Sequence, residues 1–288
     1  GQKKIIENVL LLLATEKDIG TTTTDFDQNP LLINLQNGYY DLEQDQFYDS
    51  DPKKRYLCQF RTNYIPEAKP EKWLKFLETI FEVDQERIEY IQKLVGISLT
   101  GKADFQAVIF CFGDGRNGKS TFIETLRRLF GDYFGKITSE TLLSNGKYTS
   151  NSKDYDLADL SGKRMVVGDE LSKDRSFNES LVKNLTGGDE LRARHSRENY
   201  INFSPTHTLW MFGNHKPRIT GTDEGIWRRI KLIPFEYKIP DEEVRDQSVI
   251  FKEFELEFTG ILNWAIEGYR KCQDEGVEEP KVVLDAIK

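Results

Sequence analysis

The stretch VIFCFGDGRNGKST, residues 108–121, decides the fold of this chain. An apolar run leads into the pattern Gly113-x-x-x-x-Gly118-Lys119-Ser120, and the residues from 121 to 130 have helical periodicity. A buried strand before such a loop and a helix opening out of it are the context that a P-loop requires. The stretch therefore predicts an α/β fold with a phosphate-binding loop between a strand and a helix.

The residue types of the loop suit a nucleoside triphosphate and its metal ion. The glycines let the backbone curl and aim its N–H groups at phosphates, and the helix start adds partial positive charge. Lys119 can reach the β- and γ-phosphates, and the Ser120 hydroxyl can bind Mg²⁺. We therefore expect ATP and Mg²⁺ as cofactors. The residues expected at the nucleotide are Gly113, Asp114, Gly115, Arg116, Asn117, Gly118, Lys119, Ser120 and Thr121.

Length and composition limit the class of protein. A chain of 288 residues, with 38% hydrophobic and 12% aromatic residues, can build one large domain or two modest ones. No run approaches the roughly 18 apolar residues of a membrane span. Three scattered cysteines favour a reduced, intracellular setting and argue against a zinc site. The first residue is not Met, so we expect a fragment of a longer protein.

The distribution of charge matters more than its sum. The net charge of −8 by itself argues against binding to nucleic acid. Residues 183–231, however, carry nine basic and five acidic residues, a net charge of +4, whereas residues 241–288 carry a net charge of −7. The acidic tail is best explained as a solvated surface.

The periodicity divides the chain into three segments. Residues 1–102 form a mixed amino-terminal region and a possible collar. It contains expected helices over 3–16, 70–81 and 85–99, a hairpin over 31–42 that turns at Asn37-Gly38, and a possible strand over 56–65. Residues 103–240 are the expected ATPase domain, and 241–288 are a carboxy-terminal helical segment.

Three further strands each end or begin at polar side chains. Residues 164–168 precede Asp169 and Glu170, a Walker B pattern in which the first acid helps to hold Mg²⁺ and the second activates water. Residues 208–213 precede Asn214, an amide suited to sensing the γ-phosphate. Arg228 and Arg229 precede the strand at 230–235. Each feature alone is matched by a bland alternative: an acidic turn, a turn-forming Asn, or surface charge.

A hairpin with basic residues interrupts this pattern. Residues 190–194 and 199–203 alternate like two strands around a tip at His195-Ser196-Arg197. A cationic hairpin can grip the phosphates of a nucleic acid. A surface hairpin whose charged edges prevent aggregation explains the same residues almost equally well.

The order of these motifs resembles superfamily 3 helicases, most of all the primase–helicase branch of phages, plasmids and poxviruses. The resemblance rests on the P-loop, Val-Gly-Asp169-Glu170, Lys183-Asn-Leu-Thr-Gly-Gly-Asp189, Phe-Gly-Asn214 and Ile-Trp-Arg-Arg-Ile before Pro234, and it covers roughly residues 30–236. It implies an AAA+ core with a parallel central sheet. A small mixed region would precede this core, and a helical tail would follow it.

The resemblance also implies roles for residues and partners. Lys119 and Glu170 would be catalytic, Asp169 and Ser120 would hold Mg²⁺, and Asn214 would be the sensor. Arg229, with Arg228 as its near rival, would be the finger that acts on a neighbouring subunit of a homohexamer. The hairpin would grip single-stranded DNA at the replication fork and move it 3′ to 5′, with a primase domain upstream and no membrane involved. Relatives carry Lys-His at the tip where this chain has His195-Ser-Arg197. The expected DNA-binding residues are Lys183, Arg194, His195 and Arg197, in a bacterial or viral-host cytoplasm.

Two other functions fit some of the same residues. An AAA+ ATPase that remodels or loads replication proteins would share the pocket but would not unwind DNA. A degenerate P-loop scaffold is disfavoured by the intact set of polar residues, and a GTPase by the lack of an Asn-Lys-x-Asp motif.

Overall fold

The computed structural model describes residues 4, 12, 25–143, 150–168, 176–216 and 224–287. The helix expected over 3–16 lies almost entirely outside these residues, as do Asp169 and Glu170. Within them, no helix is both long enough and apolar enough to cross a membrane.

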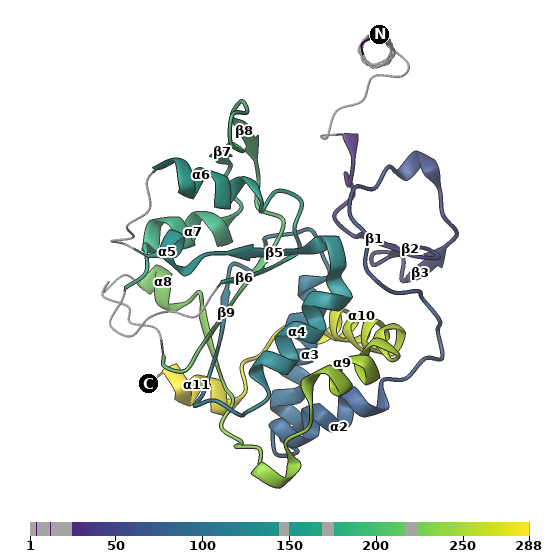
Figure 1. Ribbon diagram of the computed structural model, residues 1–288, viewed down its shortest axis with the longest axis vertical. Coiled ribbons are helices and arrows are strands. Elements are labelled where there is room, and N and C mark those ends of the chain that lie inside the picture. Colours follow the sequence, from purple (N-terminus) through teal and green to yellow (C-terminus); the bar gives the residue numbers. More distant parts are fainter. Residues whose placement is uncertain are drawn as a thin grey trace.

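A five-stranded parallel sheet forms the centre of the molecule (Figure 1), which confirms the predicted α/β class and the parallel sheet. Its strands are nearly continuous apolar runs, as expected where helices cover both faces. The P-loop strand has neighbours on both sides in the order β10-β4-β9-β6-β5. The strands are β4 (Val108–Phe112), β5 (Phe134–Ile137), β6 (Met165–Gly168), β9 (Thr208–Gly213) and β10 (Ile230–Pro234). The sequence did not predict β5, because its few residues lie in a loop-rich stretch.

Alternate residues of the strands face two separate hydrophobic cores. Ile109 and Cys111 point into the larger core and Val108 and Phe110 into the smaller one, as the period of two requires. The elements beside the larger core are α2 (Glu71–Ile80), α3 (Gln85–Ser98), α4 (Lys119–Phe130), η3 (Gly131–Tyr133), α9 (Gln247–Glu255) and α10 (Phe258–Glu275). Those beside the smaller core include α5 (Ser139–Leu142), α7 (Glu179–Gly187) and α8 (Glu224–Trp227).

The amino-terminal hairpin exists, but its turn and its size differ from the prediction. Leu35 pairs with Gly38, so the two-residue loop is Gln36-Asn37, one residue earlier than expected. A third strand follows that the sequence did not predict. The segment expected as a strand over 56–65 is irregular. It hydrogen-bonds to the edge of the sheet, with the Phe60 amide nitrogen 2.9 Å from the Asn34 carbonyl oxygen. The strands are β1 (Leu32–Leu35), β2 (Gly38–Asp41) and β3 (Gln46–Tyr48), and η2 (Pro52–Lys54) follows.

The amino- and carboxy-terminal segments pack together. Helix α10 crosses α3 so closely that a Cβ on Gly268 would lie 2.1 Å from the Gln92 carbonyl oxygen. Arg270 also donates to Asp45 at 2.6 Å and to the Tyr40 hydroxyl at 2.9 Å. All three segments contribute to the larger core, and the predicted domain boundaries stay a prediction. After α10, α11 (Lys281–Ile287) packs on β10, at one edge of the sheet.

A small two-stranded sheet projects from one end of the molecule (Figure 1). It comprises β7 (Leu191–Ala193) and β8 (Ile201–Phe203), and β7 packs against α6 (Ser150–Ala158). Helices α2 and α9 lie at the opposite end, together with the short η4 (Asp241–Glu243). The chain thus holds its projecting hairpin and its P-loop at different ends of the central sheet.

Candidate functional site

The glycine-rich loop connects the end of β4 to the start of α4. Gly118 has a φ of +83° at the N-cap of α4, a backbone region that side chains rarely adopt. A Cβ there would lie 2.6 Å from Cγ2 of Ile80 on α2. The left-handed turn and the close approach of α2 both require glycine, so the loop can wrap around a ligand with its N–H groups facing inward.

Lys119 is held inside the loop. Its ammonium donates to the Gly113 carbonyl and, at 3.0 Å, to Oδ1 of Asn117. Asn117 in turn donates to the Phe235 carbonyl at 2.9 Å, just beyond the end of β10. Both side chains are buried, so the loop positions one cation at its centre. A positive charge in a glycine-rich loop at the N-terminus of a helix is suited to bind an anion.

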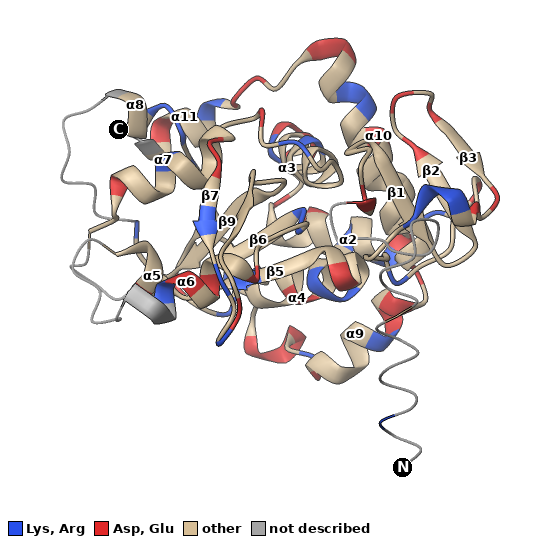
Figure 2. Cartoon of the chain, turned by 90° about the horizontal axis from the view of Figure 1, so that it is seen from above, with Lys and Arg blue, Asp and Glu red and all other residues tan. Residues whose placement is uncertain are grey.

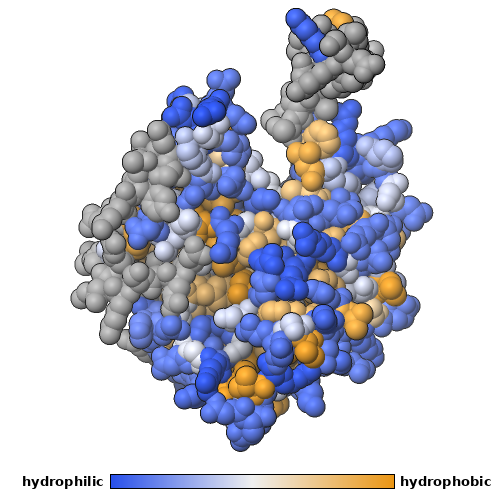
Figure 3. Space-filling model, in the orientation of Figure 1, coloured by the Kyte–Doolittle hydropathy of each residue, from blue (hydrophilic) through white to orange (hydrophobic). Residues whose placement is uncertain are grey.

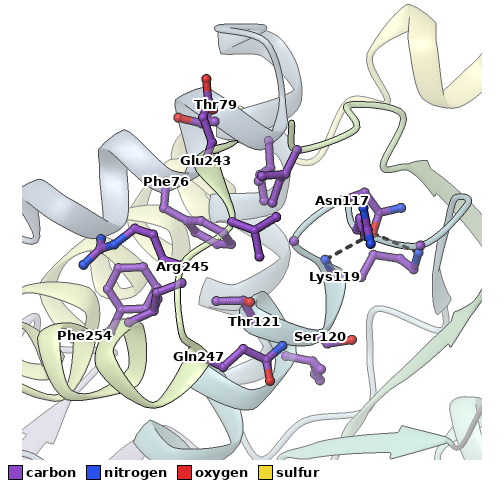
Figure 4. Close-up of a pocket in the computed structure, with 18 of the residues that line it drawn as sticks. Phe76, Thr79, Asn117, Lys119, Ser120, Thr121, Glu243, Arg245, Gln247 and Phe254 are labelled. Carbon is purple, nitrogen blue, oxygen red and sulfur yellow. Dashed lines mark hydrogen bonds between the residues drawn. The ribbon is translucent and has the colours of Figure 1, made fainter. Parts of the chain in front are cut away.

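A pocket of ≈ 1010 Å³ opens beside this loop (Figure 4). One wall is the loop and the start of α4. The other wall comes from α2 and α9, where Phe76 packs beside Gly118 and Phe254 lies across the space from Lys119 and Ser120. An apolar wall opposite an anion site fits a ligand that has a flat ring at one end and phosphates at the other.

The sequence did not reveal the wall formed by α2 and α9. Ile250 and Phe254 recur at helical spacing on α9, as Phe76 does with the apolar residues of α2. That pattern normally marks core residues. Only the fold brings α9 back onto α2, more than a hundred positions earlier in the chain. No local signal in either helix identifies this role.

Charged residues stand at the mouth of the pocket. Arg245 donates to Glu253 at 2.8 Å, and Lys72 lies 3.5 Å from the same carboxylate. The hydrogen bond from Arg245 is the largest cause that lowers the pKa of Glu253. Nearby, Arg116 of the loop forms an ion pair with Asp241, which links the segment after β10 to the loop.

Asn214 lies next to the P-loop, as its position after a neighbouring strand predicts. It follows β9, which pairs with β4, and the Gly113 amide lies 3.3 Å from the Gly213 carbonyl. Asn214 lines the pocket together with Ser120 and Thr121. Strand β6 ends at Gly168 beside β9, and the two acids that follow it lie outside the described residues.

Arg228 and Arg229 lie at the other end of the sheet. Ile230 pairs with Val108, the first residue of the P-loop strand, so the two arginines precede that end. The five residues of β4 separate them from their own P-loop by about 17 Å along the strand. Arg228 is exposed, whereas Arg229 is half-buried and donates to the Thr186 hydroxyl at 3.4 Å. Neither Arg228 nor Arg229 lines the pocket of its own copy.

The basic hairpin has shorter strands and a wider tip than predicted. Ala193 pairs with Ile201, which leaves residues 194–200 as the tip. Basic residues mark it in Figure 2, and in Figure 3 its visible face is hydrophilic. Arg197 is exposed at a φ of 65°, and Nδ1 of His195 lies 3.4 Å from Asp159. Lys183 is half-buried on α7 and lines neither the hairpin strands nor the pocket.

Family models match two parts of the chain. The model described as D5 N terminal like matches residues 1–82. The model described as a family of unknown function, DUF5906, matches residues 111–229, which hold the P-loop, β9 and both arginines.

Individual viral proteins match most of the chain. The "Putative helicase L207/L206" of Acanthamoeba polyphaga mimivirus is 33% identical over 278 residues, covering 90% of this chain and 29% of that protein. The "Primase D5" of fowlpox virus is 25% identical over 248 residues, covering 81% of this chain and 30% of that protein. The chain therefore spans less than a third of the length of these curated relatives.

The fold matches solved structures as well. The apo structure of the NrS-1 C terminal region superposes with a TM-score of 0.61 at 14% sequence identity, over 99% of this chain and 66% of that one. The parallel sheet, the motif order and the viral relatives agree with one another. The chain belongs to the superfamily 3 helicases of the primase–helicase type.

Proposed function

We propose that this chain is the ATP-hydrolysing motor part of a replicative DNA helicase. The observation that carries the proposal is the pocket between the P-loop and the α2–α9 wall, which combines an anion site with an apolar slot. ATP has the matching shape, a triphosphate at one end and a flat base at the other. Lys119 then contacts the β- and γ-phosphates. Phe76 and Phe254 border the space for the base.

Mg²⁺ completes the site in this proposal. The Ser120 hydroxyl lies on the first turn of α4 at the pocket wall, where it can bind a cation held by the phosphates. Asp169 and Glu170 follow β6 directly in the sequence, and we assign them to metal support and to activation of water. Asn214 senses the γ-phosphate from the end of β9.

Homohexamer formation and single-stranded DNA binding belong to the same proposal. Because Arg228 and Arg229 precede the far end of the sheet, hydrolysis that uses either one requires a second copy. The basic hairpin, at the end of the molecule away from α2 and α9, is the proposed contact with the strand. Contacts with phosphates are independent of base sequence and weaken with salt.

The test is ATP hydrolysis with and without single-stranded DNA, at low and high salt, on the wild type and Glu170→Gln. Stimulation by DNA that falls with salt and is lost in Glu170→Gln supports a DNA motor. Hydrolysis indifferent to DNA in a sample whose mass corresponds to a ring contradicts it. That outcome favours an ATPase that remodels or loads replication proteins.

A further inference from the structure

One face of the hairpin combines an aromatic ring with two guanidinium groups. Leu191 and Ala193 of β7 are buried beneath the hairpin, so Arg192 between them points to the opposite, outer face. The guanidinium of Arg192 lies 4.5 Å from the ring centroid of Tyr200, and that of Arg194 lies 4.7 Å from it. Tyr200 nevertheless stays 45% exposed.

The ring is also held at its hydroxyl end. The Tyr200 hydroxyl donates to Asp154 of α6 at 3.3 Å. The guanidinium groups and the carboxylate therefore fix the ring in one orientation before any ligand arrives. Ordering a long basic side chain normally costs conformational entropy on binding, and this arrangement removes part of that cost. Both guanidinium groups lie over the ring, and the part of the ring that stays exposed has the features of a stacking platform beside a phosphate site.

We infer that Tyr200 stacks on an unpaired base of the bound strand while Arg192 and Arg194 hold the phosphates beside it. This inference rests on the proposed function, because it needs a single strand at the hairpin. It moves the main contact from His195 and Arg197, which the sequence suggested together with Arg194, to the residues where the tip joins the two strands. Arg192, Arg194 and Tyr200 form this face, which we call the stacking face.

The charges around the stacking face decide which ligand fits. Asp154 and Asp159 of the neighbouring segment and Glu198 of the tip oppose a dense array of phosphates such as a duplex presents. A single strand can offer one base and its flanking phosphates to the ring and the two arginines. Stacking tolerates every base, because each has a π-face, so this contact adds affinity without sequence preference.

The test compares a thymidine oligonucleotide with an abasic sugar–phosphate strand of the same length. Fluorescence anisotropy measures the affinity of the full chain for each strand, in the presence of a non-hydrolysable ATP analogue. The wild type should prefer the thymidine strand by about tenfold, the usual contribution of one stacked base. Tyr200→Leu should bind both strands equally, whereas Tyr200→Phe should keep most of the preference because it keeps the ring.

Arg197→Ala is the matched variant at the tip. It should weaken binding to both strands by the same factor and leave the ratio of the two affinities unchanged, because a phosphate contact does not depend on the base. A Tyr200→Leu protein that keeps the wild-type melting curve and the wild-type preference overturns the inference. Wild-type binding to both strands with equal affinity overturns it too, while the proposed DNA motor survives. A wild-type ring that binds neither strand overturns the proposed function and the inference together.

Discussion

The pocket beside the P-loop and the hairpin are built in opposite ways. In the pocket the key cation, Lys119, is buried and bonded to the loop that carries it. On the hairpin Arg192 is exposed, and the strands around it are three residues long. So small a sheet is marginally stable by itself and depends on its contacts with α6. Substitutions should therefore disrupt the pocket through geometry and the hairpin through charge.

The largest expected effect is in the pocket. Lys119→Ala removes the only cation that the loop holds at its centre among the described residues, and we expect hydrolysis to fall by roughly 10²–10³-fold or more. Steady-state ATP hydrolysis measures the change. Lys136→Ala is the matched control, because Lys136 is exposed on β5 and lines no part of the pocket. Equal rates for the two variants would refute the assignment of this loop.

Two glycines of the loop separate the cost of a steric contact from the cost of a left-handed backbone. Gly118→Ala places a Cβ against Ile80 on a left-handed backbone. It should lower the free energy of unfolding by about 2–3 kcal/mol. Gly115 has a φ of 29°, and a Cβ added there would have no heavy atom within 4 Å. For Gly115→Ala only the backbone cost of about 1 kcal/mol applies. Urea unfolding of both variants measures the difference. Equal losses would mean that the contact with α2 contributes nothing.

The segment that joins the hairpin to β9 is an exception to this contrast between a buried pocket and an exposed hairpin. His207, just before β9, is buried, and neither ring nitrogen has a hydrogen-bond partner among the described residues. Burial lowers the pKa of His207 to about 4 from its ordinary 6.5, so the folded chain keeps it neutral.

The unfolded chain binds this proton more readily than the folded one. Stability is therefore complete above pH 6.5 and is lost as the pH falls toward 4, at up to about 1.4 kcal/mol per pH unit. Urea unfolding between pH 7 and pH 4.5 measures this slope. A flat profile for His207→Gln identifies its source, and an unchanged slope in that variant assigns the effect to other groups.

The smallest expected effect is at the tip. Arg197→Ala should lower the ratio of DNA-stimulated to basal hydrolysis, and it should reduce the slope of log affinity against log salt by about 1. Hydrolysis and binding titrations at several salt concentrations measure both quantities. Full stimulation in this variant would exclude Arg197 from the DNA contact and leave the stacking face as the candidate.

The sequence predicted the centre of the molecule better than its margins. The P-loop strand, β6, β9 and β10 are apolar runs that end at marked positions, because buried parallel strands need no polar alternation. β5 escaped prediction because Phe134–Ile137 contains a glycine and a lysine, and only its neighbour β6 makes it a strand.

The site shows the same limit. Lys119, Ser120 and Asn214 are recognisable because their chemistry is local to one motif. Phe76 and Phe254 become neighbours only when α9 folds back onto α2, and Tyr200 meets Arg194 only across the hairpin. Long-range packing produces these pairs, and no spacing within a helix or a strand encodes them.

The position of the two arginines has a consequence for counting. Each copy carries its P-loop at one end of the sheet and Arg229 toward the other. Under the proposed finger role, the arginine of one copy completes the pocket of the next. In an open row of copies, the pocket at one end and the arginine at the other end would then have no partner, and only a closed ring would complete every pocket. We expect the activity per copy to rise with assembly and to level off when rings close, so the specific activity would report the fraction of closed rings.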